Sequence, residues 1–268
     1  MNNSVAANHY DSNYGDFGGE LYRQIRQDSF GEDIGQNSWL TSAEQDEFLS
    51  WLNLNPGRTL LDVGCGAGGP ALRIAARTGC SIIGVDIHGK AIATANSLAS
   101  TRGLGARTEF RVIAATERLP FSDESFDAVT CIDAINHLPD RPAVIADWHR
   151  LLKSDGRLVF TDPLVVTGPL TNSEIYARTP SGFYLLVPAD YDEQVLIGGG
   201  FHVLKSQDTT ERMAAVAEKR RTARAFYELD LRRVESDQAY ESQQEFLGAV
   251  ARMARECRLS RKLFLAVK

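Results

Sequence analysis

The sequence predicts an α/β protein with a doubly wound, Rossmann-like sheet of seven mostly parallel strands. Between residues 59 and 164, short apolar runs alternate with longer segments of helical periodicity, which is typical of parallel βαβ units. A glycine-rich turn follows the first apolar run, at the end of the strand where such sheets bind ligands. The last apolar run, at 263–267, is expected to complete the sheet as an antiparallel C-terminal strand.

Residues 1–55 are expected to form an N-terminal lid segment followed by a helix. The first 40 residues are polar and aromatic with interspersed glycines, which is typical of a loosely ordered tail or of a cover over a bound ligand. Thr41-Ser42-Ala43-Glu44 is a capping box and predicts a helix start. Asn55-Pro56-Gly57 ends that helix.

Residues 56–164 form the predicted core. The expected strands are 59–63, 81–86, 108–113, 126–132 and 156–162, and the expected helices are 70–78, 89–102 and 141–153. Right-handed crossovers between parallel strands place the helices on both faces of the sheet. Ligands of such sheets bind beyond the carboxyl ends of the strands, near the point where the strand order reverses.

Residues 165–200 are rich in proline and tyrosine and are expected to form an insertion over the site, ending in a short helix at about 189–198. Residues 201–268 contain two further strands and a charged helical stretch at 209–256. Acidic and basic residues alternate in that stretch, which favours a solvated helical face over a basic binding patch.

Composition narrows the possible partners. The formal charge of −6 argues against a nucleic-acid partner, and no apolar run of about 18 residues predicts a membrane span. The polar N-terminus predicts no signal peptide. Four scattered cysteines without C-x-x-C spacing predict free thiols in a reducing cytoplasm and no metal site.

The glycine turn follows Leu60 to Val63 and is compatible with two kinds of ligand. Gly64, Gly66 and Gly69 satisfy the G-x-G-x-x-G fingerprint of dinucleotide sites, with Asp86 following 86 − 64 = 22 positions later. Asp62 favours the other ligand, because a carboxylate beside the turn suits a cationic group and repels a pyrophosphate. A purely structural strand-to-helix turn is the third possibility.

The D-x-G-x-G run resembles the signature of class I S-adenosylmethionine (SAM)-dependent methyltransferases. The resemblance implies that Asp62, Gly64 and Gly66 hold the methionine part of SAM. It also implies that Asp86, at the end of the second strand, accepts hydrogen bonds from both ribose hydroxyls, with Ile87 beside it.

The run from Glu117 to Asp127 resembles the L-P-F-x-D-x-S-F-D motif of the same family. An Asp-Ala pair usually precedes that motif and contacts adenine, but this chain has Ala115-Thr116. We therefore expect backbone groups there to bind the adenine. By the same resemblance the remaining SAM contacts are expected from Gln36, Ser38, Glu117 and Asp133.

A narrower resemblance is to phosphoethanolamine and other small-amine N-methyltransferases, carried by Phe30-Gly31-Glu32, the Asp-Ala-x-x-His-Leu run at 133–138, and Tyr176-x-Arg178 with Tyr184. It implies that His137 pairs with an N-terminal tyrosine over the methyl acceptor. The candidates for that tyrosine are Tyr14 and, second, Tyr10. The expected acceptor-side residues are Tyr10, Tyr22, Tyr176, Arg178 and Tyr184.

This narrower resemblance fails at Phe246-Leu247-Gly248-Ala249-Val250, where the family has a phosphate-binding lysine. An apolar acceptor, or one with a carboxylate for Arg178, is therefore favoured over a phosphorylated one. The sequence thus predicts methyl transfer from SAM, with S-adenosylhomocysteine (SAH) as product, to N or O of a small metabolite by a cytoplasmic monomer or homodimer. Its alternatives are a SAM-binding protein with non-transfer chemistry and, less favoured, an NAD-dependent oxidoreductase.

Overall fold

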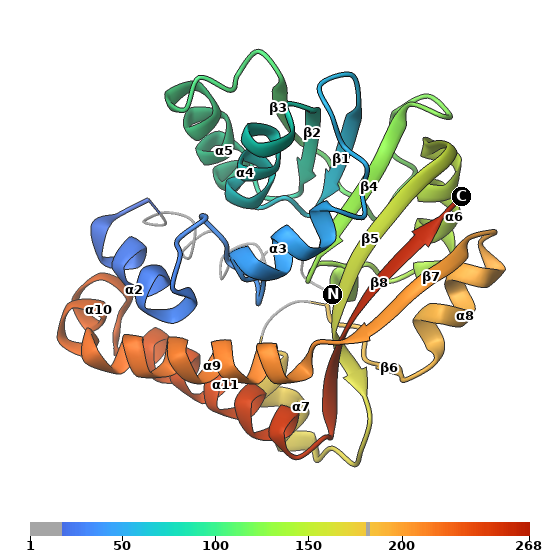
Figure 1. Cartoon of the computed structure of the whole chain (residues 1–268). Coiled ribbons are helices and arrows are strands. Elements are labelled where there is room, and N and C mark those ends of the chain that lie inside the picture. The colour runs from blue at the N-terminus through green and yellow to red at the C-terminus, as the bar shows by residue number, and fades with distance from the viewer. Residues whose placement is uncertain (1–17, 181–182) are drawn as a thin grey trace.

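The computed structural model describes residues 18–180 and 183–268, which build an α/β fold around one twisted sheet (Figure 1). The strands are β1 Thr59–Val63, β2 Ser81–Asp86, β3 Thr108–Val112, β4 Phe126–Ile132, β5 Leu152–Val166, β6 Val187–Pro188, β7 His202–Asp208 and β8 Leu259–Val267. Their order is β3-β2-β1-β4-β5-β8-β7, and the two-residue β6 pairs with β5 off this path. Only β8 runs antiparallel to its neighbours β5 and β7 among the pairings of the described strands. The predicted fold class is confirmed, with β6 as an additional strand.

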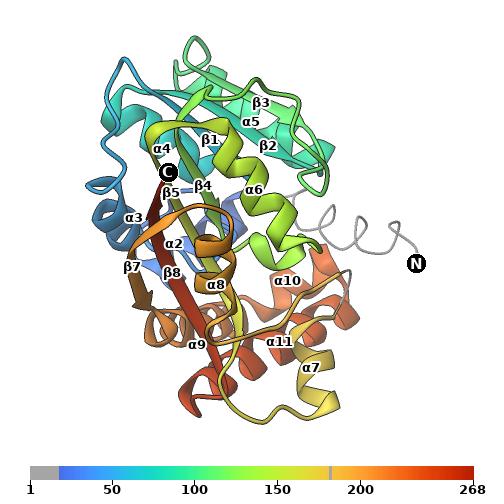
Figure 2. The same ribbon diagram turned by 90° about the vertical axis from the view of Figure 1, so that its right-hand side faces the viewer.

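The helices cover both faces of the sheet and extend past its carboxyl edge. They are α2 Glu20–Phe30, α3 Ser42–Leu49, α4 Gly69–Thr78, α5 Gly89–Thr101, α6 Arg141–Leu151, α7 Asn172–Arg178, α8 Tyr191–Gly198, α9 Thr210–Phe226, α10 Glu228–Glu235 and α11 Asp237–Arg255, with a 3₁₀ turn, η1, at Ile135–His137. Figure 2 shows α6 and α8 on one face of the sheet, with α7, α9 and α11 beyond its end. No helix in the described ranges is both long enough and apolar enough to cross a bilayer.

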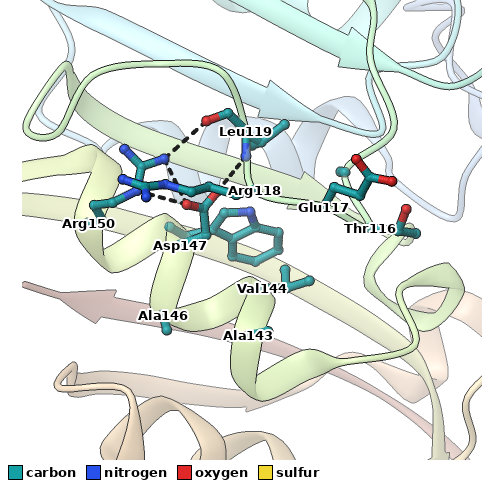
Figure 3. Close-up of a pocket in the computed structure, with 11 residues that line it drawn as sticks. Thr116, Glu117, Arg118, Leu119, Ala143, Val144, Ala146, Asp147 and Arg150 are labelled. Carbon is teal, nitrogen blue, oxygen red and sulfur yellow. Dashed lines mark hydrogen bonds and ion pairs between the residues drawn. The ribbon is translucent and has the colours of Figure 1, made fainter.

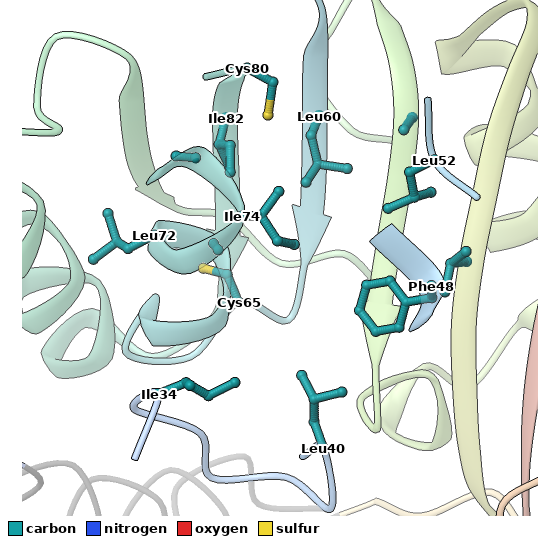
Figure 4. Packing of buried hydrophobic residues seen from close by; sticks show 14 of the residues in the cluster. Ile34, Leu40, Phe48, Leu52, Leu60, Cys65, Leu72, Ile74, Cys80 and Ile82 are labelled. Atoms are coloured by element: carbon teal, nitrogen blue, oxygen red, sulfur yellow. The ribbon is translucent and has the colours of Figure 1, made fainter. Parts of the chain in front are cut away.

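Side-chain alternation along the strands explains the two layers. Leu60 on β1 packs with α3, α4 and α5, whereas the next residue, Leu61, packs with α6 and α8. Figure 4 shows the first of these cores, to which Leu60 and Ile82 from the strands and Phe48 from α3 all belong. Ile34 and Leu40 from the segment after α2 close that core below the glycine turn.

Two helices were not predicted. α2 lies in the segment read as a tail or cover, and its Ile25 packs with Leu231 and Tyr240 from α10 and α11. Gly31 ends it in the left-handed region (φ 79°). α7 lies in the insertion and begins at a capping box, in which the Thr171 hydroxyl accepts from the Glu174 N–H.

Candidate functional site

The glycine turn is too tight for side chains. A Cβ added to Gly64 (φ 71°) would lie 2.5 Å from the Cβ of Ala134, and one added to Gly68 (φ 75°) would lie 2.8 Å from the Cβ of Ala95. Both positions also require the left-handed backbone that glycine adopts without strain. The N–H groups of Gly64 and Cys65 donate to the Val85 carbonyl at 2.8 and 3.1 Å. The turn is therefore fixed against β2, and at Gly69 it packs closely against the backbone of Ile34 and Gly35.

Two carboxylates flank this turn. Asp62 is buried, and its Oδ1 accepts from the Thr130 hydroxyl at 2.8 Å. No cationic side chain in the described part of the chain pairs with it. Burial raises the pKa of Asp62 to about 7 against the effect of the Thr130 hydroxyl, and the charge of Asp86 adds to the rise. A ligand with a positive group beside Asp62 would compensate the buried charge.

Asp86 joins the turn to the end of β2. Its two oxygens accept from the N–H groups of Gly66 and His88, each at 2.9 Å. Because a carboxylate oxygen has two lone pairs, each of the two Asp86 oxygens can accept a further hydrogen bond, from a ribose hydroxyl. Ile87 follows with 59% of its surface exposed, which suits a residue that packs on a bound ring.

The predicted adenine-binding residues line a cavity of about 310 Å³ between the loop after β3 and helix α6. Ala115 is among the lining residues, and Figure 3 shows Thr116 and Glu117 on one side of the cavity with Ala143 and Val144 on helix α6. The Leu119 N–H donates to Asp147 at 2.9 Å and fixes this loop to α6. The position of Ala115 and Thr116 is compatible with backbone contacts to a ring resting on Ile87.

Three other predicted SAM contacts have side chains that are engaged within the protein. The buried Gln36 accepts from the Ile34 N–H at 2.9 Å, and the Ser38 hydroxyl accepts from the Leu40 N–H at 3.2 Å. Asp133 (φ 54°) bonds Arg261 at 2.7 Å, as well as the Thr161 hydroxyl and the Trp39 N–H. The Asp133 carboxylate thus bonds groups within the protein, and a contact between Asp133 and SAM would have to be made by the Asp133 backbone.

On the acceptor side, His137 lies next to Tyr184. Their ring centroids are 4.7 Å apart, and His137 Nδ1 is 3.1 Å from the carbonyl oxygen of Phe183. Burial lowers the pKa of His137 to about 4, opposed by that carbonyl and reinforced by the positive charges of Arg178 and His88. The imidazole is therefore neutral at pH 7, and the carbonyl assigns the proton to Nδ1, which leaves Nε2 as the basic nitrogen.

The other predicted acceptor residues are spread more widely. Arg178 is buried, donates to the Pro163 carbonyl at 3.4 Å and lies 5.2 Å from the centroid of Phe246. Tyr176 is 75% exposed, and the Tyr22 hydroxyl donates to Glu235 at 2.7 Å. Tyr10 and Tyr14 lie outside the described residues.

The prediction missed two residues that organise this region. Trp39 stacks on Phe246 at 5.9 Å between ring centroids while its N–H donates to Asp133. Arg261 is fully buried in β8, but in the sequence it stands between Ser260 and Lys262, so no local signal distinguishes it from an exposed cation. These residues connect the N-terminal segment to the end of β4.

The fold and the site together suit a nucleoside ligand with a cationic group. The sheet has carboxylates at the ends of its first two strands, joined by a turn that only glycines can form. Residues 61–160 match the family model described as "Methyltransferase domain". Over these residues the chain is therefore similar to methyltransferase domains.

Relatives of known activity are small-molecule methyltransferases. The chain is 29% identical over 206 residues to the 27-O-demethylrifamycin SV methyltransferase of Amycolatopsis mediterranei, covering 72% of this chain and 75% of that protein. It is 30% identical over 191 residues to phosphoethanolamine N-methyltransferase 3 of Arabidopsis thaliana, covering 71% of this chain but 38% of the relative. The chain thus spans well under half of the plant protein.

Among solved structures, a similar one is phosphoethanolamine N-methyltransferase 2 of Haemonchus contortus in complex with phosphomonomethylethanolamine and SAH. The TM-score is 0.80 at 22% identity, covering 97% of this chain and 60% of that one. At this identity the likeness concerns the fold alone.

Proposed function

We propose that this protein transfers a methyl group from SAM to a nitrogen or oxygen atom of a small metabolite. The observation that carries the proposal is the contact between the glycine turn and η1: Gly64 has no room for a Cβ because Ala134 lies against it. Ala134 directly precedes η1, which ends at His137. The turn expected to hold the methionine part of SAM therefore adjoins the residue expected to face the acceptor.

In this proposal the protein binds SAM and the acceptor, orients them and accepts a proton from the acceptor. SAM supplies an electrophilic methyl group, whose C–S bond breaks as the new C–N or C–O bond forms, leaving SAH. Asp62 compensates the cationic end of the cofactor, and Asp86 accepts from its ribose. Neutral His137 holds the acceptor N–H or O–H at Nε2 and can take its proton, with Tyr14 as the proposed partner.

The acceptor is proposed to be a small molecule with an apolar body. The rifamycin and phosphoethanolamine enzymes show that relatives act on small molecules of different chemistry. In this chain Phe246, stacked on Trp39, supplies apolar surface. Arg178 lies above the ring of Phe246 and is proposed to bind a carboxylate of the acceptor.

Binding of the cofactor tests the first half of the proposal. Asp86→Ala should weaken SAH binding by about 100-fold in calorimetry, because hydrogen bonds to a charged group are lost and the turn loses its tie through Gly66. Asp123→Ala is the control, since that carboxylate is exposed and pairs with Arg150. Unchanged SAH affinity in Asp86→Ala, or tight binding of NAD by the wild type, would contradict the assignment.

His137 tests the second half. With labelled SAM and an acceptor found in a metabolite extract, His137→Gln should lower turnover about 100-fold with SAH affinity within about twofold of wild type. Because His137 is neutral above about pH 4, its ionisation should give no step in wild-type activity between about pH 5 and pH 8. His202→Gln, at the exposed start of β7, is the control. An acid limb near pH 6.5 that disappears in His137→Gln would show an ordinary, solvated histidine instead.

A further inference from the structure

A second, smaller cavity lies between α2 and α9. Its volume is about 60 Å³, and it is lined by residues of α2, of the segment that follows it and of the C-terminal helices. At about 10–15 Å³ for each water, it has room for about four to six waters, which is the size of a carboxylate or phosphate group. Gln36, Asn37 and Gln243 give it polar walls.

Three arginines line this cavity, and their partners differ. Arg26 pairs with Asp33 at 2.7 Å, and Arg224 pairs with Glu235 at 2.6 Å. Arg220, from α9, has no carboxylate partner and no hydrogen bond within residues 18–180 and 183–268. Among the described residues, the carboxylates paired with this group thus number two against three guanidinium groups, and Arg220 is the one without a described counterion.

Aromatic rings hold the Arg220 guanidinium in place. It lies 5.6 Å from the ring centroid of Trp39 and 6.0 Å from that of Phe30. Burial, and then the positive charges of Arg224 and Arg26, lower its pKa to about 10. A half-buried charge without a counterion is unfavourable for folding, so its presence points to a ligand that supplies the negative charge.

Trp39 contacts both Arg220, which lines the cavity, and Phe246 on the acceptor side. The Trp39 ring has Arg220 near it and is stacked on Phe246, which in turn lies below Arg178. The Trp39 N–H is bonded to Asp133 at the end of β4, four residues before His137. Arg220 is therefore a cation next to the Trp39 ring that stacks on Phe246.

We propose that Arg220 binds an oxyanion, a carboxylate or phosphate group, of the methyl acceptor. The planar fork of arginine matches the two oxygens of such a group and can bind them together. The proposal rests on the methyl transfer proposed above and adds that the acceptor carries a negative charge. The acceptor then has an anionic end at Arg220 and its reacting atom toward His137.

Thermal unfolding of the SAH-bound protein tests this proposal. Sodium phosphate or sodium benzoate should raise the melting temperature of the wild type above that in sodium chloride of equal ionic strength. Arg220→Met should lose the response, with the apparent dissociation constant of the oxyanion rising about 10- to 100-fold. Arg221→Met removes the same charge from the next, exposed position of α9 and should keep the response. A response retained by Arg220→Met would overturn the proposal.

Two further measurements distinguish an acceptor site from a cofactor site and from a folding defect. SAH carries a carboxylate of its own, so a fall in SAH affinity in Arg220→Met would assign the cavity to the cofactor and overturn the proposal. Arg220→Lys keeps the charge without the planar fork and should retain a weakened response, which allows the test even if the methionine variant does not fold. Neither readout requires methyl transfer. Failure of the wild type to bind SAH would instead defeat the proposed function.

Discussion

Asp62→Asn is expected to raise the melting temperature of the ligand-free protein and to weaken SAH binding by about 100-fold. The folded protein raises the pKa of Asp62 from 3.8 to about 7 because the carboxyl is buried. The folded state therefore binds a proton that the unfolded state has released, and this carboxyl increasingly destabilises the fold as the pH rises from about 4 to about 7. Above pH 7 the cost is on the order of 2–4 kcal/mol. Asparagine removes the charge and still accepts from the Thr130 hydroxyl.

The same carboxyl makes cofactor binding depend on pH. A cationic ligand needs the ionised form, so the affinity of the wild type for SAH should fall by up to about tenfold for each pH unit below about 7. Calorimetry in buffers of different ionisation enthalpy should detect proton release in this range. In Asp62→Asn both the pH dependence and the proton release should be lost.

Asp46→Asn is a control for which the melting temperature should change in the opposite direction. A hydrogen bond from Arg73 lowers the pKa of Asp46 on the surface, so its ionised form is favoured in the folded protein. Its removal should slightly lower the melting temperature and leave SAH binding unchanged. If Asp62→Asn instead lowers the melting temperature and keeps wild-type SAH affinity, the buried carboxylate is not the cofactor's partner.

The middle of the sheet could be predicted closely because its central strands, such as β1 and β4, are buried on both faces. Continuous apolar runs that end in glycine or aspartate mark such strands, and the predicted ranges 59–63 and 81–86 coincide with β1 and β2. The predicted strand at 156–162 was too short, since β5 spans Leu152–Val166. Pro163 ended the prediction, but the register of β5 against β8 shifts between Asp162 and Val165, which accommodates a proline.

Helix α2 could not be recognised from local sequence because its stability comes from partners far along the chain. Leu21, Tyr22 and Ile25 pack with Tyr227 and other residues of the C-terminal helices, about 200 positions away. The capping box of α7, at Thr171 and Glu174, is by contrast a local signal for a helix start, although it lies among the prolines of the insertion.

Some residues of the candidate site could likewise be placed from the sequence, whereas others depend on partners far along the chain. Asp62 and Asp86 stand at strand ends, so topology alone places them beside the glycine turn. The partners of Asp133 are not local, since Arg261 is 128 positions away. Arg220 and Arg221 are equivalent in the sequence, and only the packing of α9 shows that Arg220 lines a cavity.

Arg261→Met is expected to destabilise the protein by about 3–5 kcal/mol. The Arg261 guanidinium bonds Asp133 and Glu44, each at 2.7 Å, and all three side chains are buried. Burial alone would lower the pKa of Arg261, but Asp133 and Glu44 raise it, so the guanidinium keeps its charge although it is buried. Methionine fills similar space but leaves two buried carboxylates without a cation, each of which is costly.

Urea unfolding with Lys262→Met as the control measures this effect. Lys262 is the next residue of β8 and pairs at 2.9 Å with a half-exposed Asp208, so its loss should lower the free energy of unfolding by less than about 1 kcal/mol. An equally small effect of Arg261→Met would contradict a structural role for the buried ion pairs. Adding Glu44→Gln to Arg261→Met should recover part of the loss, because one of the stranded charges is removed. Since Asp133 also bonds the Trp39 N–H, Arg261→Met should loosen the segment that carries Trp39, and with it the arrangement of Trp39 and Arg220.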